Sequence, residues 1–290
     1  MSLEQLLLDP LKPEFMQRAL LAVMMIGVVS GVVGAYVVTR GMAFLGDALA
    51  HSVLPGVAIA FLTSGSSGQS LLIGGLAAGI ISALGVGFLT RGERLAQDTA
   101  IGIVFSGMLA LGIGIISTNQ NFAVDLSHVL IGNILAVSRD DLAAIAVIAA
   151  VIVGVIVLFY KEFLVASFDP TLVKTLRLPG ETLRLVLLVL LAVTIVISLQ
   201  VVGVALVAAM LVTPAATARF FTRKLHHMMF IGALLGALSG VVGIYLSWHL
   251  RVAPSAAIVL TMTAIFLLAF FFAPGKGYVW SMIGRNARVA

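Results

Sequence analysis

The sequence of 290 residues contains no cysteine and little charge: Asp, Glu, Lys and Arg make up 10% of it, whereas 61% is hydrophobic. The absence of cysteine excludes disulfide bonds and thiolate metal ligands. A mean hydropathy of +1.18 exceeds what a soluble domain needs, because apolar surface on that scale requires lipid to cover it. The composition therefore predicts an all-α protein that crosses a membrane many times.

Several motifs that define a chemistry are also missing. The sequence has no GxxxxGK[ST] motif to bind ATP phosphates and no HExxH motif of a zinc protease. The GALSG segment at 236–240 has no histidine partner in view, which argues against an intramembrane protease. No regular series of arginines indicates a voltage sensor. We therefore expect no catalytic site, and an energy source that is either an ion gradient or a partner protein.

Uncharged windows long enough for a membrane-spanning helix, about 20 residues, follow one another along the chain. They lie at 19–39, 69–90, 99–124, 142–160, 228–248 and 252–275. The stretch 41–63 also qualifies, apart from two polar residues. The window 185–218 is too long for one helix, and Gln200 and Gly203 indicate a turn that divides it into two. The count is thus about nine crossings, or eight if this window forms only one.

The Lys and Arg residues are distributed unevenly between alternate loops. With the N-terminus outside, the inner segments contain thirteen of the 17: Arg40, Arg91, Arg94, Lys161, Lys174, Arg177, Arg184, Arg219, Arg223, Lys224, Lys276, Arg285 and Arg288. The outer segments contain only Lys12, Arg18, Arg139 and Arg251. Because basic loops remain on the cytoplasmic side, we expect an outer N-terminus and a cytoplasmic C-terminus. The excess positive charge then reflects topology and not nucleic-acid binding.

We expect a single transmembrane domain over residues 1–290. Residues 1–15 are predicted to form an interfacial helix, 161–184 the largest cytoplasmic loop and 276–290 a cytoplasmic tail. Glycines spaced by four residues predict close helix packing. They are Gly27 and Gly31, Gly75 and Gly79, and Gly232, Gly236 and Gly240.

A carboxylate and an imidazole interrupt the apolar pattern in RGMAFLGDALAHSVLPG, residues 40–56. Asp47 and His51 are four residues apart, so a helix places both on one face. Burying ionisable groups in a membrane is costly unless they are paired, hydrated or liganded, which favours a divalent-cation site facing a pathway. Two alternatives remain open: Asp47 caps a helix or pairs with Arg40, and His51 is a hydrogen-bonded packing residue.

One Asp and one His provide half of a first-row metal site. Two copies of the chain around a twofold axis would supply two carboxylates, and these would neutralise a divalent ion. Pro55 and Gly56 follow the pair and permit the broken helix with which transporters expose ion sites.

The inner loop 161–184 contains a second pattern. Asp169 and Pro170 form an N-cap and N1 pair, and Pro179 with Gly180 is expected to end the helix that follows. A short capped helix in a cytoplasmic loop is a docking element for another protein or, alternatively, a solvated connector.

Four segments together resemble the permease subunits of ABC importers of metal ions. They are RGMAFLGDALAHSVLPGVAIAF, SHVLIGNILAVS, ASFDPTLVKTLRLP and VVGVALVAAMLVTPAATAR. The resemblance extends from about residue 15 to 275 and is to the manganese, zinc and iron group. Within that group, GNILAV and AMLVTPAATA are more similar to manganese members than to zinc members.

The resemblance implies an architecture like that of the vitamin B12 importer, as a homodimer in the bacterial inner membrane. It implies two cytoplasmic ATP-binding subunits and an external metal-binding protein as partners, with alternating access as the mechanism. The ion, Mn²⁺ or else Zn²⁺ or iron, is cargo, and no cofactor is permanently bound. A gradient-driven secondary transporter or a channel is the rival from another class.

The resemblance also assigns residues. Asp47 and His51 become metal ligands in the pathway. The element that couples to the ATPase comprises Phe168, Asp169, Pro170, Leu172 and Lys174. Independently of the resemblance, Asp125 and His128 lie three residues apart on the outer side. They either receive metal from the binding protein or serve as a helix cap and a surface histidine.

Overall fold

The computed structural model describes residues 9–65, 68–93, 95–118, 132, 134–274 and 277–278. Every regular element within these residues is a helix, so the all-α prediction is confirmed. Eight helices in this part of the chain are long and apolar enough to cross a membrane, counting α3 and α4 as one span. The protein is therefore a polytopic membrane protein.

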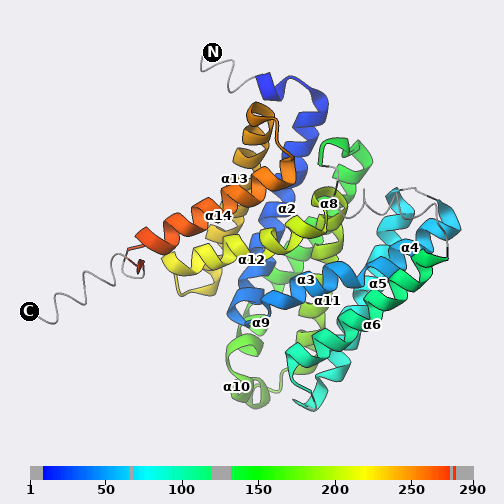
Figure 1. Ribbon diagram of the computed structural model, residues 1–290. Helices are drawn as coiled ribbons and strands as arrows, with labels where there is room; N and C mark the ends of the chain where they lie inside the picture. Colours follow the sequence, from blue (N-terminus) through cyan, green and yellow to red (C-terminus); the bar gives the residue numbers. More distant parts are fainter. Residues whose placement is uncertain are drawn as a thin grey trace, which may run out of the picture.

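Apart from α6 and η3, the described helices follow one another with short connections (Figure 1). In chain order they are η1 (Asp9–Leu11), α2 (Glu14–Thr39), α3 (Ala43–Ser52), α4 (Leu54–Ser64), α5 (Gly68–Leu89), η2 (Arg91–Glu93), α6 (Gln97–Ser117), η3 (Ile134–Ala136), α8 (Arg139–Leu158), α9 (Tyr160–Phe168), α10 (Pro170–Thr175), α11 (Gly180–Val202), α12 (Val204–Phe221), α13 (Leu225–Leu250) and α14 (Pro254–Phe272).

The long window 185–218 is divided as predicted. Helix α11 ends at Val202 and α12 begins at Val204, with Gly203 between them at φ 77°. A positive φ is readily adopted only by glycine, so this one residue separates the two helices. Because α12 has only 18 residues and falls below the length of the eight long spans, the number of crossings stays a prediction.

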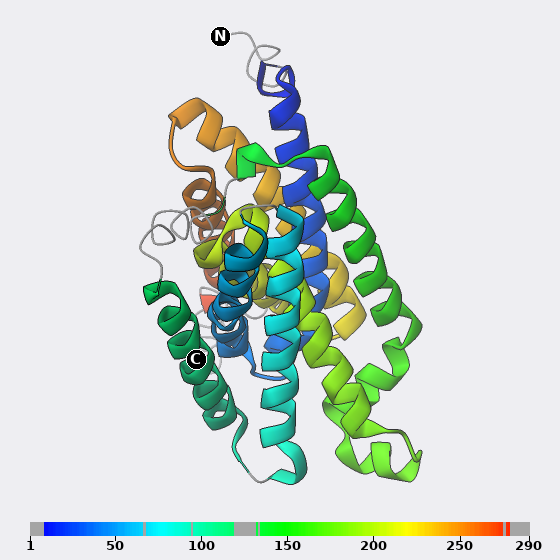
Figure 2. The same cartoon turned by 90° about the vertical axis from the view of Figure 1, so that its right-hand side faces the viewer.

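The helix termini gather at two ends of the bundle. At one end, Arg40 after α2 donates a hydrogen bond to the carbonyl of Ala166 in α9, over 3.0 Å. At the other end, Arg139 of α8 forms an ion pair with Glu14 of α2. The start of α2 lies at the top of Figure 1 and α10 at the bottom, and α8 runs beside α2 in Figure 2. This grouping agrees with the predicted inner and outer segments, and which end faces the cytoplasm stays a prediction.

Helix α2 lies at the centre of the bundle and crosses α13 at glycines (Figure 1). A Cβ atom on Gly31 would lie 2.4 Å from the backbone of Gly232, and one on Gly27 would lie 2.6 Å from that of Gly236. Only residues without side chains permit this approach, so the predicted close packing is confirmed here. Gly75 of α5 likewise faces the side chains of neighbouring helices.

The predicted terminal segments fall mostly outside the described residues. Of 1–15, the structure describes η1 and the first residues of α2, which begins at Glu14. Of the tail 276–290, it describes only residues 277 and 278. The interfacial helix and the cytoplasmic tail therefore stay predictions.

Candidate metal pathway and coupling segment

The predicted metal ligands lie together on the accessible face of α3. The Oδ1 atom of Asp47 is 3.9 Å from the Nε2 atom of His51, and the two side chains are 49% and 33% exposed. The intervening residues 48–50 are buried in the bundle. Because a charged side chain is not left facing lipid, we expect this face to border water or another protein surface.

An aromatic wall borders the histidine. The ring of His51 packs edge-on against Phe105 of α6, with 5.9 Å between the ring centroids. Phe105 in turn packs against Phe44, one turn before Asp47 on α3. The wall restricts the orientation of the imidazole ring, and its apolar surface would lower the dielectric beside an ion held there and strengthen each ligand contact.

The structure contradicts the alternatives for these two residues. Helix α3 begins at Ala43, so Asp47 lies inside it and does not cap it. Arg40 donates to a backbone carbonyl of α9 and does not pair with Asp47. The ring nitrogens of His51 have no hydrogen-bond partner among the residues the structure describes. Both side chains are thus available as ligands.

One chain supplies only part of a metal site. Within the described residues, no group of three or more His, Asp, Glu or Cys side chains is close enough to hold an ion. Two ligand bonds of about 2.1 Å at a tetrahedral angle place the donor atoms about 3.4 Å apart. The observed 3.9 Å between Asp47 and His51 exceeds this by an amount that small side-chain rotations remove. The pair can therefore bind one ion together, with further ligands from elsewhere.

The helix is interrupted directly after the pair, as predicted. Helix α3 ends at Ser52 and α4 begins at Leu54, while Val53 between them keeps helical angles of φ −75° and ψ −23°. Pro55 has no N–H, so the carbonyl of His51 loses its usual helical donor. The interruption is confined to one turn next to the candidate ligands.

The coupling segment begins as predicted. Helices α9 and α10 meet at Asp169, whose Oδ1 atom accepts hydrogen bonds from the backbone N–H groups of Thr171 and Leu172, over 3.0 and 2.9 Å. Pro170 occupies the first turn of α10, where its missing N–H costs nothing. The N-cap and N1 pair is confirmed.

The predicted end of α10 is wrong. The helix ends at Thr175, before the Pro-Gly pair, because Arg177 adopts the left-handed conformation with φ 52°. The N–H of Leu178 then bonds to the carbonyl of Val173 over 3.0 Å, which completes a Schellman motif. Pro179 instead precedes the first residue of α11.

Apolar side chains of this segment are exposed at the α10 end of the bundle. Phe168 is 57% and Leu172 39% exposed, and Leu176 and Lys174 are exposed beside them. Large apolar side chains gathered on a loop mark a contact surface.

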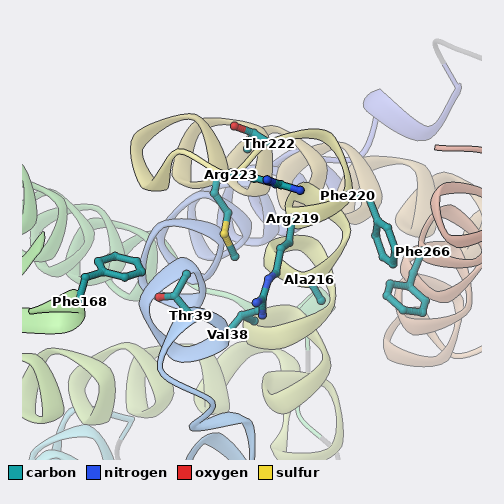
Figure 3. A pocket seen from close by; sticks show the side chains of 10 residues that line it. Val38, Thr39, Phe168, Ala216, Arg219, Phe220, Thr222, Arg223 and Phe266 are labelled. Atoms are coloured by element: carbon teal, nitrogen blue, oxygen red, sulfur yellow. The ribbon is translucent and has the colours of Figure 1, made fainter. Parts of the chain in front are cut away.

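A cavity of about 690 Å³ opens next to Phe168 (Figure 3). Arg219 and Arg223 of the α12 end line it, and Phe220 and Phe266 lie across from Phe168. Among the described residues that line this cavity there is no carboxylate, and Arg219 and Arg223 contribute two guanidinium groups. A divalent cation is repelled there, so the cavity is not a metal site and the Asp–His pair on α3 remains the candidate.

Two features mark the limits of sequence reasoning. Asp125 and His128 lie outside the described residues, so the suggested outer site stays a prediction. Phe105 was not anticipated, since it is one apolar residue within an uncharged window and nothing local distinguishes it.

An all-helical bundle with a polar pair beside a helix interruption is typical of membrane transport subunits. The model of the ABC 3 transport family matches residues 12–273. The chain belongs to this family, which comprises permease subunits of ABC transporters of metal ions.

Named relatives agree with the family. The manganese transport system membrane protein MntC of Listeria monocytogenes is 45% identical over 267 residues, which cover 92% of this chain and 94% of that protein. The manganese import system permease protein ScaB of Streptococcus gordonii is 39% identical, covering 91% and 94%. A probable iron transport system membrane protein of Haemophilus influenzae is 40% identical, covering 92% and 96%.

Solved structures agree as well. PsaBC from Streptococcus pneumoniae in complex with Fab matches with a TM-score of 0.83 and 36% identity, covering 97% of this chain and all of that one. An inward-facing putative metal-chelate type ABC transporter matches with a TM-score of 0.72, covering 88% and 85%, and its 14% identity supports the fold alone.

Proposed function

We propose that the chain is the permease of an ATP-driven importer of Mn²⁺ in the bacterial plasma membrane. The observation that supports the proposal is the Asp47–His51 pair, accessible on α3 and without a hydrogen-bond partner among the described residues, in a member of this family. The manganese names of the relatives MntC and ScaB favour Mn²⁺. The iron name of another relative at 40% identity keeps iron as a second candidate, beside zinc.

Two copies of the chain would complete the site. Each contributes one carboxylate and one imidazole, and a twofold axis gathers all four around one ion. The two carboxylates neutralise the charge of M²⁺, and the two imidazoles help to replace its water. This lowers the cost of bringing the ion into a low dielectric. The half-site that the described residues present on an accessible face supports the proposed homodimer.

Energy comes from other subunits in this proposal, because the sequence has no phosphate-binding motif. Two cytoplasmic ATP-binding subunits each bind the exposed segment from Phe168 to Lys174 of one permease copy. ATP binding and hydrolysis then shift the two permease copies between outward- and inward-open arrangements. An external binding protein delivers the ion at the end where the N-terminus lies.

Reconstitution tests the transport function. The permease, its ATPase subunit and the binding protein are placed in liposomes, and Mn²⁺ uptake is measured with ATP. We expect uptake that depends on ATP and stops when the phosphate-binding lysine of the ATPase is replaced. Uptake by the permease alone in response to an ion gradient would establish the rival secondary transporter or channel.

Alanine variants test the ligands. Asp47→Ala removes both carboxylates from the dimer, and we expect uptake to fall by about a hundredfold, equivalent to about 2.7 kcal/mol. His51→Ala should reduce uptake less and favour ions that prefer oxygen ligands. Asp140→Ala, an exposed carboxylate at the start of α8, is the matched control and should transport normally. Full uptake by well-expressed Asp47→Ala protein would contradict the ligand role and indicate that Asp47 and His51 have a structural role only.

A further inference from the structure

The turn between α2 and α3 contains an arginine without a carboxylate partner. Arg40 is only partly exposed, and no ion pair within the described residues includes it. Burial, and then repulsion from Arg184, lower the pKa of the Arg40 guanidinium group. The charge is thus held in a place that disfavours it, and within the described residues its hydrogen bond is to the carbonyl of Ala166.

The carbonyl of Ala166 lacks its usual helical hydrogen-bond donor because of the residue four positions later. In an uninterrupted helix, the carbonyl of Ala166 accepts from the N–H four residues later. That residue is Pro170, which has no N–H. The Nη2 atom of Arg40 replaces the missing donor over 3.0 Å, as basic side chains do at helix C-termini. Arg40 therefore completes the end of α9 at the point where α9 leads into α10.

The contact extends into the core. Below it, the rings of Tyr36 in α2 and Phe163 in α9 pack edge-to-face with 6.0 Å between their centroids, and both side chains are buried. The end of α2 and the end of α9 are thus joined by one apolar contact and one hydrogen bond.

On its other side, Arg40 belongs to a tight turn that leads directly into the helix of the candidate metal ligands. Gly41 has φ 70°, and the N–H of Met42 bonds to the carbonyl of Val37 over 2.9 Å, which is the Schellman pattern. Helix α3 begins at the next residue, and Asp47 lies one turn further on. The turn is therefore too short and too well bonded to absorb a displacement of its ends.

Space for movement exists next to this contact. A groove of about 870 Å³ is lined by Arg40, Lys174 and Arg184, so this side of α10 is open and not packed against the bundle. Arg184, on the C-terminal side of α10, donates to the carbonyl of Gly87 in α5 over 2.6 Å. Arg184 lies in α11, whereas Arg40 is followed along the chain directly by α3.

We propose that Arg40 is a positioning residue that links the coupling segment to the helix of the metal ligands. When ATP-binding subunits move α10, the hydrogen bond between Arg40 and Ala166 transmits the movement to α3 and changes access to Asp47 and His51. This inference rests on the proposed function as an ATP-driven permease.

Three variants of the complete importer in liposomes test the link. Arg40→Met keeps the aliphatic stem and removes the N–H donors. It should lower Mn²⁺ uptake by about tenfold, within the range of coupling between two sites, while ATP hydrolysis and Mn²⁺ binding stay at the parent level. Arg40→Lys retains a donor and a charge and should restore a large part of the uptake. Arg91→Met removes an exposed arginine at the same end and should transport like the parent.

A second measurement follows α3 itself. The chain has no cysteine, so a cysteine at the exposed position Ala43 can be labelled alone. Trapping the ATPase with ADP and vanadate should change the labelling rate of the cysteine at position 43 in the parent protein. The same treatment should leave that rate unchanged in Arg40→Met.

The outcomes separate the inference from the proposed function. A parent complex that imports no metal refutes the proposed function. Normal uptake by Arg40→Met, in a parent that transports, overturns the link alone. If the Arg40→Met complex loses its ATPase subunits, Arg40 serves subunit docking. If the variant loses Mn²⁺ binding or thermal stability together with uptake, Arg40 serves the fold. Either result overturns the link. If trapping with vanadate does not change the labelling rate at position 43 in the parent protein, the proposed link is overturned as well.

Discussion

Truncating the exposed apolar side chains of the coupling segment should uncouple the importer. Phe168→Ala combined with Leu172→Ala removes the two large side chains that flank the capped start of α10. Both side chains are exposed, so neither belongs to the buried core of the permease. We therefore expect a folded permease that still binds Mn²⁺ but no longer transports it with ATP.

The magnitude follows from the exposed surface. A phenylalanine buries about 200 Å² when it is covered completely, and 57% of Phe168 is open to solvent. Covering the remaining area, at about 25 cal/mol per Å², contributes about 3 kcal/mol. The 39% exposed fraction of Leu172 adds about 1 kcal/mol. The ordering of side chains and the desolvation of polar groups on binding offset part of this sum. We therefore expect the affinity for the ATPase to fall by about a hundredfold.

The assay measures binding of the purified ATPase subunit, Mn²⁺ uptake and Mn²⁺ binding side by side. Phe88→Ala is the matched control, because Phe88 is 70% exposed near the C-terminal end of α5 but outside the coupling segment. It should leave all three quantities unchanged. Parent-level affinity and uptake in the double variant would show that the ATPase contacts another surface.

Two further predictions concern topology and packing. In the cysteine-free background, Lys12→Cys should react with an impermeant thiol reagent added outside intact cells, and Arg91→Cys should react only after the inner face is opened; the reverse pattern refutes the outer N-terminus. Gly31→Ala places a Cβ atom 2.4 Å from the α13 backbone and should destabilise the protein by about 1–3 kcal/mol in thermal unfolding in detergent. Gly102→Ala, which meets no atom within 4 Å, should be neutral or slightly stabilising, and an equal loss in both variants contradicts the packing account.

Features that depend on a few neighbouring residues were predictable. The length of an apolar run determines a spanning helix, and a single glycine at 203 separates two of them. Asp169 and Pro170 act through backbone groups within one turn. Asp47 and His51 share a face because of the helical repeat alone. The prediction that Pro179 and Gly180 end α10 was wrong, because Arg177 ends the helix earlier. Arg177 adopts the left-handed conformation, which sequence reasoning expects of glycine and not of arginine.

The partners of these elements were decided by the tertiary structure. Glycine spacing in α2 indicates close packing but not that α13 is the neighbour, since lipid and protein interiors are equally apolar and hydrophobicity does not select a partner in a membrane. Phe105 reaches His51 only because α6 lies against α3. Arg40 could not be assigned from its own sequence context, because the carbonyl that it satisfies is left open by a proline in a distant loop. A hydrogen-bond donor and an unpaired acceptor so far apart in the chain meet only when the bundle has formed.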